Sequence, residues 1–161
     1  MGPTNRLLGD GDVLIIDTGI TYDGYFCDFD RNLAFGRIPD ATRKAHEVIF
    51  HATDAGFAAA HPGATTSDVW AAMWRELDEG GTLGNSVGRM GHGLGMQLTE
   101  WPSVKPHDNA VLEPGVVLTL EPGMEFTPGK QLVHEENIVI TEDGAQYLSH
   151  RAPQEIPIAG I

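Results

Sequence analysis

The sequence predicts an α+β domain, with a mainly antiparallel sheet and with helices on one side of it. Three observations support this prediction: strand-like apolar runs lie near both ends, two helical stretches lie between them, and Pro-Gly or Asp-Gly pairs separate the later strands. A chain of 161 residues with 41% hydrophobic content has the size of one domain that buries its own core. We therefore expect residues 1–161 to form a single domain.

The first predicted element is a β-hairpin. Residues 13–17 (VLIID) and 25–29 (YFCDF) are short apolar runs typical of buried strands. The segment between them contains Asp23-Gly24, a pair that favours a tight hairpin turn. We therefore expect the two runs to pair as antiparallel strands.

Two helices are predicted after the hairpin. The stretch from residue 40 to about residue 61 has helical composition and spacing, and Pro62-Gly63 ends it. Residues 65–81 begin with capping residues and end in Gly-Gly, which predicts a second helix of about three turns. The chain then returns to strands in three segments, 116–123 (VVLTLEPG), 130–144 (KQLVHEENIVITEDG) and 145–150 (AQYLSH).

The net charge of the chain limits the classes of partner that we expect it to bind. A formal net charge of −13 argues against nucleic acid and anionic membranes, because both need clustered Lys and Arg. No apolar run approaches the roughly 20 residues of a membrane helix, and residues 1–12 lack the apolar core of a signal peptide, so we expect a cytoplasmic protein. Cys27 is the single cysteine, which excludes a cysteine-based zinc site, and its strand context predicts a small buried apolar residue.

Carboxylates inside the predicted hairpin indicate a cation site. If the loop is centred on residues 22–23, Asp17 lies opposite Asp28. If it is centred on residues 23–24, Asp17 lies opposite Asp30. Because residues 28 and 30 share a face, either register brings carboxylates together. Opposed like charges destabilise a hairpin, so we expect a cation between them.

A second acidic pair lies near the end of the chain. Glu121 closes the apolar run VVLTL, Glu135 lies in LVHEENIVI, and Pro128-Gly129 stands midway between them. His92 lies between glycines, where the backbone can approach a ligand closely. Four carboxylates and one imidazole suit one or two divalent ions such as Mn, Co, Fe or Zn, about 3.5 to 4 Å apart if two are present.

These motifs resemble the pita-bread metallohydrolases, a family that includes methionine aminopeptidase, Xaa-Pro aminopeptidase, Xaa-Pro dipeptidase (prolidase) and creatinase. The resemblance covers residues 9–149 and implies the pita-bread fold, a curved, mainly antiparallel sheet with helices on its outer face. The family's five metal ligands match in type, order and spacing: Asp17 in IIDTG, Asp28 in GYFCDFDR, His92 in GHGLG, Glu121 in LEPGM and Glu135 in VHEENIVITEDG.

The resemblance implies a dinuclear metal site. Asp17 would chelate one ion, Asp28 and Glu135 would bridge, and His92 and Glu121 would complete the other position. A metal-bridging hydroxide would attack an amide carbonyl, with Glu121 as general base and His92 beside it in the catalytic centre. The implied enzyme is an Xaa-Pro dipeptidase or aminopeptidase-type exopeptidase with two divalent ions, manganese before the others. Its substrates would be short peptides or small amides, and relatives are often homodimers.

Three departures from the family concern the substrate. Peptidases of this family usually carry a second histidine seven residues after the metal-binding one, and this chain has Thr99. A threonine donates a hydrogen bond but cannot carry positive charge. Proline-specific members often have an Arg where Val133 stands. The usual threonine two residues after the second aspartate is replaced by Asp30, which is interpreted as an extra ligand, as an outer-sphere group or as a partner of Arg31.

Substrate contacts are expected from Thr99, Glu100, Trp101 and Asp30, the first three because they follow the metal-binding histidine on the segment that lines the family's cleft. For Trp101, core packing is an equal alternative, since buried aromatic side chains dominate protein cores. The remaining histidines considered show no ligand spacing and are interpreted as surface or structural groups: His46, His51, His61, His107 and His150.

Two alternatives to a peptidase stay open. The same metal site could serve a non-peptidase, either a small-molecule C–N hydrolase or a lyase. The other alternative is an inactive binding module. In the family a helix-containing half precedes the first metal-bearing strand, whereas about a dozen residues precede it here. We therefore expect a domain that is short on its N-terminal side and lacks most of the first half of the fold.

Overall fold

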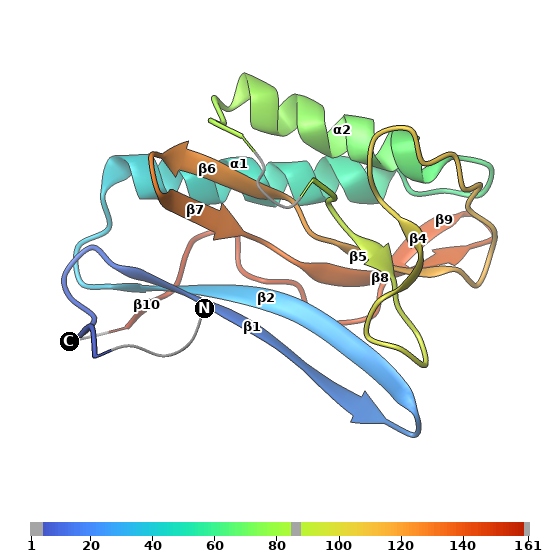
Figure 1. The fold of residues 1–161 in the computed structure, drawn as a ribbon, viewed down its shortest axis with the longest axis horizontal. Helices are drawn as coiled ribbons and strands as arrows, with labels where there is room; N and C mark the ends of the chain where they lie inside the picture. Colours follow the sequence, from blue (N-terminus) through green and yellow to red (C-terminus); the bar gives the residue numbers. More distant parts are fainter. Residues whose placement is uncertain (1–4, 85–87, 160–161) are drawn as a thin grey trace.

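The computed structural model describes residues 5–84 and 88–159. Two long helices lie on one side and a long hairpin lies on the other (Figure 1). In chain order the elements are β1 (Val13–Tyr22), β2 (Tyr25–Phe35), α1 (Asp40–Ala59), α2 (Thr66–Glu79), β3 (His92–Gly93), β4 (Glu100–Ser103), β5 (Val117–Leu120), β6 (Gly123–Thr127), β7 (Lys130–Val133), β8 (Glu136–Thr141), β9 (Gly144–Tyr147) and β10 (Ile158–Ala159).

The β1–β2 hairpin has one of the two expected registers, the one whose loop is centred on residues 23–24. Asp23 and Gly24 both have positive φ, 49° and 84°, which is the geometry of a two-residue type I′ turn. This turn places Asp17 directly opposite Asp30, while Asp28 lies opposite Gly19. The loop centred on residues 23–24 is therefore correct, and the alternative that opposes Asp17 to Asp28 is wrong.

The two predicted helices are confirmed. Helix α2 begins with a reciprocal capping box, in which the side chains of Thr65 and Asp68 each accept from the other residue's backbone N–H. It buries Val69, Met73 and Leu77, which are four residues apart and so share one helical face. Neither described helix is both long enough and apolar enough to cross a lipid bilayer.

The strands form three sheets, where the sequence predicts one. Strands β4-β3-β5-β8-β9 form a five-stranded sheet, β6-β7 form a two-stranded ribbon, and β1-β2-β10 form a third sheet. The ribbon continues the register of β5 and β8, because Leu120 pairs with Glu136 and Gly123 pairs with Val133. The interruption falls at Pro122, which has no N–H to donate to a ladder. Glu121 and Glu135 therefore lie across from one another where the ladder is broken.

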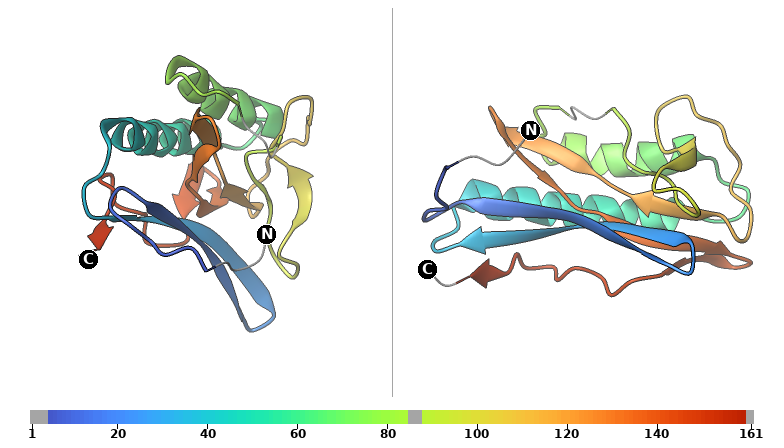
Figure 2. Two further views of the ribbon diagram at one scale, coloured as in Figure 1. Left: turned by 60° about the vertical axis from the view of Figure 1, so that its left-hand side comes forward. Right: turned by 60° about the horizontal axis from the view of Figure 1, so that its bottom comes forward.

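The hairpin and the helices cover opposite sides of the central strands (Figure 2). Side chains join the hairpin to the segment 133–137. Asn137 accepts from the backbone N–H of Asp28 at 3.0 Å and donates to the carbonyl of the same residue. Asn32 donates to the carbonyl of Val133 at 2.7 Å. The polar layer between hairpin and central sheet is thus held by side-chain to backbone bonds.

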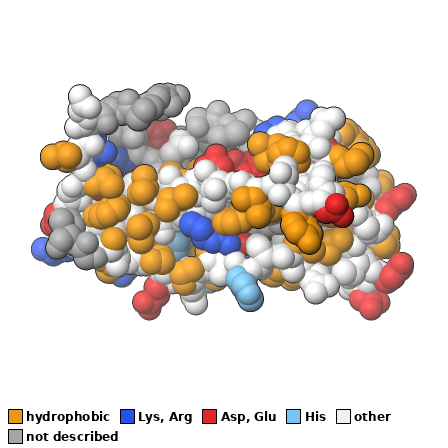
Figure 3. Space-filling model, turned by 90° about the horizontal axis from the view of Figure 1, so that it is seen from below, with side chains coloured by type: hydrophobic (Ala, Val, Ile, Leu, Met, Phe, Trp, Pro, Cys, Tyr) orange, Lys and Arg blue, Asp and Glu red, His pale blue; other side chains and the backbone are white. Residues whose placement is uncertain are grey.

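The outer face of the hairpin is exposed and largely apolar. Hydrophobic side chains gather on the face seen from below in Figure 3. On β1, Ile20 is 68% exposed and Tyr22 is 83% exposed, with Leu14 and Ile16 also on the surface. Cys27 is half-buried, so the prediction of a fully buried cysteine is wrong.

Candidate metal centre

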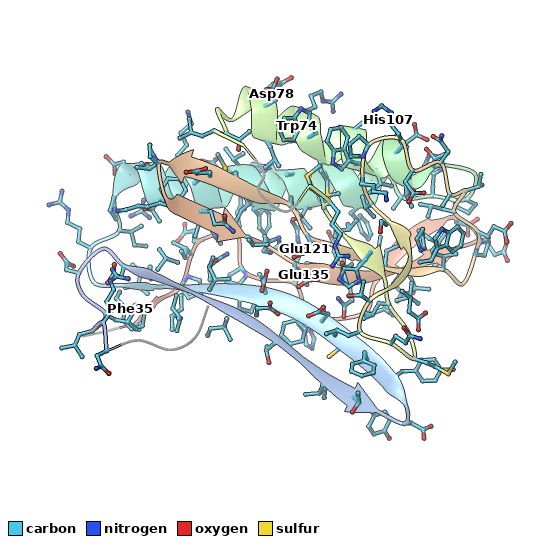
Figure 4. The ribbon with its side chains drawn as sticks, in the orientation of Figure 1. Phe35, Trp74, Asp78, His107, Glu121 and Glu135 are labelled. Carbon is cyan, nitrogen blue, oxygen red and sulfur yellow. The ribbon has the colours of Figure 1, made fainter. Side chains whose placement is uncertain are left out.

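Separate segments of the chain converge between the hairpin and the central sheet. Strands β1 and β2 bring Asp17, Asp28 and Asp30, and β3 brings His92. The interruption of the ladder brings Glu121, directly after β5, and Glu135, directly before β8. Figure 4 shows the two glutamates close together between the central strands and the hairpin.

The converging side chains form two groups that share one residue. In the first group, ligand atoms of Asp28, His92 and Glu135 lie within 4.8 Å of one another. In the second group, the same limit holds for Asp17, Asp30 and Glu135. Glu135 is therefore placed to contribute to two adjacent positions, as a bridging carboxylate does.

His92 has the orientation of a metal ligand. Its Nδ1 lies 2.9 Å from the carbonyl oxygen of Gly93, and since a carbonyl only accepts, Nδ1 carries the proton. The lone pair is then left on Nε2, which lies 3.7 Å from the Asp28 carboxylate. The backbone N–H of His92 donates to the Thr119 hydroxyl at 3.1 Å. A hydrogen bond that fixes the tautomer is usual for metal-binding histidines.

The glycines beside His92 allow the neighbouring backbone segments to approach β3 closely. Gly91 has a φ of 140°, and a Cβ there would meet the carbonyl oxygen of Thr119 at 2.1 Å. A Cβ on Gly93 would meet the carbonyl oxygen of Trp101 at 2.3 Å. The sequence predicts a close approach of the backbone to a ligand at these glycines. In the structure, the backbone of β3 approaches the flanking backbone segments closely.

The centre buries more negative charge than its protein partners balance. Burial, and then the neighbouring Glu121 carboxylate, raise the pKa of Glu135 to about 9. Burial, and then Asp17, raise the pKa of Asp30 to about 7. The pKa values of Asp28 and Glu121 are raised as well, with burial as the main cause. Buried carboxylates in this number are tolerable only when protonated or paired with cations.

Unpartnered oxygens show where a cation fits. Among the described residues, buried carboxylate oxygens without a hydrogen-bond partner include Asp30 Oδ1, Glu121 Oε2 and Glu135 Oε1. The donor set is oxygen-rich with one imidazole nitrogen, which suits divalent first-row metals. The residues present therefore fit a site for divalent ions.

Stability of the metal-free protein is expected to fall as pH rises from about 5 to about 9. Glu135 and Asp30 have raised pKa values, about 9 and about 7, so the folded chain binds their protons more tightly than the unfolded chain. The stabilisation is complete below the unfolded pKa values and is lost as pH rises through the folded ones. Thermal melts of chelator-treated protein across this range measure the effect. A melting temperature that increases with pH would contradict it, and saturating Mn²⁺ should cancel the decrease because ligands bind metal in the deprotonated form.

A largely buried ionic network, which the sequence does not predict, lies behind the centre. Arg31 donates to the carbonyl oxygens of Asp30 and Glu135, at 2.7 and 3.0 Å, and to the Glu136 carboxylate at 3.1 Å. Burial works to raise the pKa of Glu136, but hydrogen bonds from His134 and the Ala152 N–H, with the Arg31 charge, hold it below its usual value. Asp30 does not pair with Arg31 through its carboxylate, so that interpretation is wrong.

His134 was also missed. It is fully buried, its Nδ1 lies 2.7 Å from the Thr53 hydroxyl, and its Nε2 lies 3.4 Å from Glu136. The signal available in the sequence was the polar run His-Glu-Glu-Asn inside an otherwise apolar strand. Consecutive polar residues at such a place indicate more than a single ligand, because a strand presents successive side chains to opposite faces and both faces are then polar.

A pocket opens beside the acidic groups. It has a volume of about 580 Å³, and Asp17 and Asp28 line it together with Ile20, Phe26 and Leu98. Its wall is partly apolar, which suits a hydrophobic group held next to the carboxylates. The last three of these residues were not predicted, because a single apolar residue in a strand or loop carries no sequence signal for a pocket.

The four residues expected to contact the substrate differ in their exposure and in their distance from the metal centre. Thr99 is exposed, and Trp101 is 77% exposed, so the core-packing alternative for this tryptophan is wrong. Glu100 accepts from the backbone N–H of Gln97 at 2.7 Å and closes its own loop. Asp30 lies inside the second ligand group. Of the four, Asp30 alone is brought to the metal centre among the described residues.

Comparisons with known proteins identify the family of the chain. The sequence profile of metallopeptidase family M24 matches residues 1–142. A Bacillus subtilis protein named uncharacterized peptidase YqhT is 35% identical over 156 residues, which are 96% of this chain and 44% of that protein. An Xaa-Pro dipeptidase of Pyrococcus furiosus is 31% identical over 139 residues, covering 86% of this chain and 40% of the relative.

Solved structures extend the agreement to the fold. The dipeptidase PepE from Mycobacterium ulcerans matches with a TM-score of 0.90 and 30% identity, over 98% of this chain and 43% of that one. The prolidase from Pyrococcus furiosus matches with a TM-score of 0.87 and 29% identity, over 93% and 44%. The pita-bread prediction is thus confirmed, for a chain that spans less than half the length of these relatives. With its profile match over most of its length, the chain belongs to metallopeptidase family M24.

Proposed function

We propose that this chain supplies the dinuclear metal site of a metal-dependent exopeptidase that hydrolyses short peptides, with Xaa-Pro dipeptides as the first class to test. One observation carries the proposal: two groups of ligand atoms, each within 4.8 Å, share Glu135. Two adjacent positions joined by a carboxylate suit the hydrolysis of an amide, where both the attacking and the leaving groups need stabilisation. The names of the relatives, peptidases and Xaa-Pro dipeptidases, support the same reaction class.

The residues of the centre would have separate roles in catalysis. Bound divalent ions supply Lewis acidity toward a scissile carbonyl and lower the pKa of water. Glu121 serves as general base, since its pKa is raised mainly by burial and one of its oxygens has no protein partner. The positive charge of Arg89, which acts on Asp28 and Glu121, balances part of the acidity at the same site. The apolar wall of the adjacent pocket, with Leu98, would receive the hydrophobic part of the substrate.

Manganese is the proposed metal. The two ligand groups contain carboxylates and a single imidazole, and oxygen-rich sites of this kind suit Mn²⁺. Cobalt, iron and zinc remain alternatives within the same donor set, and metal analysis of the purified protein separates them. We further propose that the protein acts in the cytoplasm and, as relatives of this fold often do, as a homodimer.

A second function is a non-peptidase reaction on the same site, hydrolysis of a small-molecule C–N bond or a lyase reaction. Two observations favour it. Thr99 stands exposed where the peptidases carry a second histidine, and it cannot supply a positive charge to a peptide intermediate. Val133 stands where proline-specific members have an arginine, and it is a buried apolar side chain.

The test is metal analysis followed by a substrate comparison. Elemental analysis should give close to two divalent ions per chain, and removing them with a chelator should lower the melting temperature. The Mn²⁺-loaded protein is then assayed with Xaa-Pro dipeptides, with dipeptides lacking proline, and with small amides and sulfonium compounds. Hydrolysis of the dipeptides supports the exopeptidase, whereas turnover of small molecules alone supports the second function. Two bound ions without any turnover would identify an inactive binding module, and a metal-free chain indifferent to chelator would overturn the proposal.

A further inference from the structure

We propose that Asp30 is itself a metal ligand, which together with Asp17 and Glu135 forms an oxygen-only position next to the imidazole-containing position of Asp28 and His92. The inference rests on the proposed dinuclear site and deepens it. It assigns to Asp30 a role that the five family ligands do not include. Its consequence is that the two metal positions differ in the ions they prefer.

The register of the hairpin carries the first part of the argument. The type I′ turn sets Asp30 directly opposite Asp17, and Asp28 opposite Gly19. Asp17 therefore has Asp30 as its neighbour across the ladder, whereas Asp28 lies two residues nearer to the turn. The ligand atoms divide in the same way, since Asp30 groups with Asp17 and Glu135, while Asp28 groups with His92 and Glu135.

The environment of the Asp30 carboxylate carries the second part. The residue is 4% exposed, and its Oδ1 has no hydrogen-bond partner among the described residues. Glu135, which faces the same group, is 2% exposed and has one unpartnered oxygen as well. A buried carboxylate oxygen that lies near two further carboxylates is stabilised in its ionised form when a cation lies between them.

The guanidinium of Arg31, next to Asp30 in the chain, binds groups other than the Asp30 carboxylate. Arg31 directs its guanidinium to the backbone carbonyls of Asp30, Glu135 and His150 and to the Glu136 carboxylate. These bonds fix the backbone of Asp30 and leave its side chain to the metal centre. In the ionised form, the Asp30 carboxylate therefore has no cation in direct contact among the described residues, and a bound ion would supply it.

The chemistry of the donors predicts unequal positions. Carboxylate oxygens alone suit hard ions such as Mn²⁺ and Mg²⁺, whereas a position with an imidazole also accepts Zn²⁺ and Co²⁺ readily. The oxygen-only position would therefore take Mn²⁺, and the position that holds His92 would keep a softer ion when both metals are offered.

The test compares Asp30→Asn with Asp23→Asn in the full protein. Both variants exchange aspartate for the isosteric amide in the same hairpin, but Asp23 lies in the exposed turn, at a positive φ that asparagine adopts readily. Mn²⁺ binding is measured by calorimetric titration and by the Mn²⁺ electron paramagnetic resonance signal. The Co²⁺ absorption spectrum monitors the imidazole position separately.

Loss of an outer-sphere partner lowers metal affinity about 10–100-fold. For Asp30→Asn we expect the affinity of one Mn²⁺ equivalent to fall by more than this. The Co²⁺ spectrum should be retained, and Asp23→Asn should match the wild type. Unchanged Mn²⁺ binding, or a loss within the 10–100-fold range, would overturn the inference while leaving the dinuclear site intact. A wild type that binds no metal would instead overturn the proposed function.

A folding control keeps the result interpretable. Because the variant removes a buried unpaired charge, the metal-free melting temperature of Asp30→Asn at pH 8 should equal or exceed that of the wild type. Asp30→Thr, which removes the carboxylate and introduces the residue usual in the family, provides an independent variant: one Mn²⁺ equivalent should bind more weakly than in the wild type, while the five family ligands still hold two ions at saturating Mn²⁺. Normal Mn²⁺ affinity in this second variant would also overturn the inference.

Discussion

Replacing Glu135 with glutamine is expected to abolish tight binding of both metal ions. Glu135 is the residue common to the two ligand groups, and it is 2% exposed, so water does not readily take its place. An amide is neutral and has one oxygen in place of two, and it therefore cannot bridge two cations as a carboxylate does. Elemental analysis after dialysis and calorimetric titration with Mn²⁺ measure the effect, which should exceed about 100-fold in affinity for each ion.

A matched control and a contrast sharpen this result. Glu142→Gln makes the same chemical change at an exposed turn between β8 and β9 and should leave metal binding unaltered. His92→Ala removes a ligand from one group only, so it should lose one ion and retain the position of Asp17, Asp30 and Glu135. If Glu135→Gln retained two ions, the shared-ligand geometry would be refuted.

Arg31→Ala is expected to destabilise the fold more than any surface substitution. The Glu136 side chain is fully buried, and Arg31 is its guanidinium partner at 3.1 Å. Breaking a fully buried ion pair costs about 3–5 kcal/mol. Because the Arg31 side chain is 25% exposed and Glu136 keeps its hydrogen bond from the Ala152 N–H, we expect the lower end of this range, about 3 kcal/mol, or about 6–12 °C in melting temperature for a chain of this size. Chemical unfolding and thermal melts of the metal-free protein measure the loss.

The control for this prediction is Arg75→Ala. Arg75 lies on α2 with its side chain 68% exposed, and its ion pair with Glu76 spans 3.8 Å on the surface. Exposed pairs of this kind contribute about 0–1 kcal/mol, so the melting temperature should change little. If Arg31→Ala had the same melting temperature as this control, the network behind the metal centre would not be a source of stability.

Local sequence signals were sufficient for both helices, for the first hairpin and for the positions of the acidic pairs, but they did not predict β3, β4 or β10. Asp23-Gly24 identified the hairpin turn, and Pro128-Gly129 marked the second turn midway between Glu121 and Glu135. These predictions succeeded because turn geometry is set by neighbouring residues. The choice between two registers was left open, because both keep residues 28 and 30 on one face.

Residues that act across the fold could not be identified in this way. Asn137 bonds to the backbone of Asp28 from 109 positions away, and Arg31 reaches Glu136 from 105 positions away. Such partners are set by how the hairpin packs on the central sheet, and no local pattern encodes that distance. The place of Glu100 after His92 predicts a substrate contact, and its carboxylate accepts from the Gln97 N–H within its own loop, so that contact stays a prediction.

The hairpin and the central sheet are far apart along the chain, and the proposed metal site joins them only in the folded state. A divalent ion held by Asp28 and Glu135 would bind the folded chain and not the unfolded chain, so its stabilising effect would rise with the concentration of free ion, to about 2.7 kcal/mol at 100 times the dissociation constant. The supply of the ion would therefore govern how often the chain opens and meets proteases. The lifetime of the protein in the cell would then depend on metal availability.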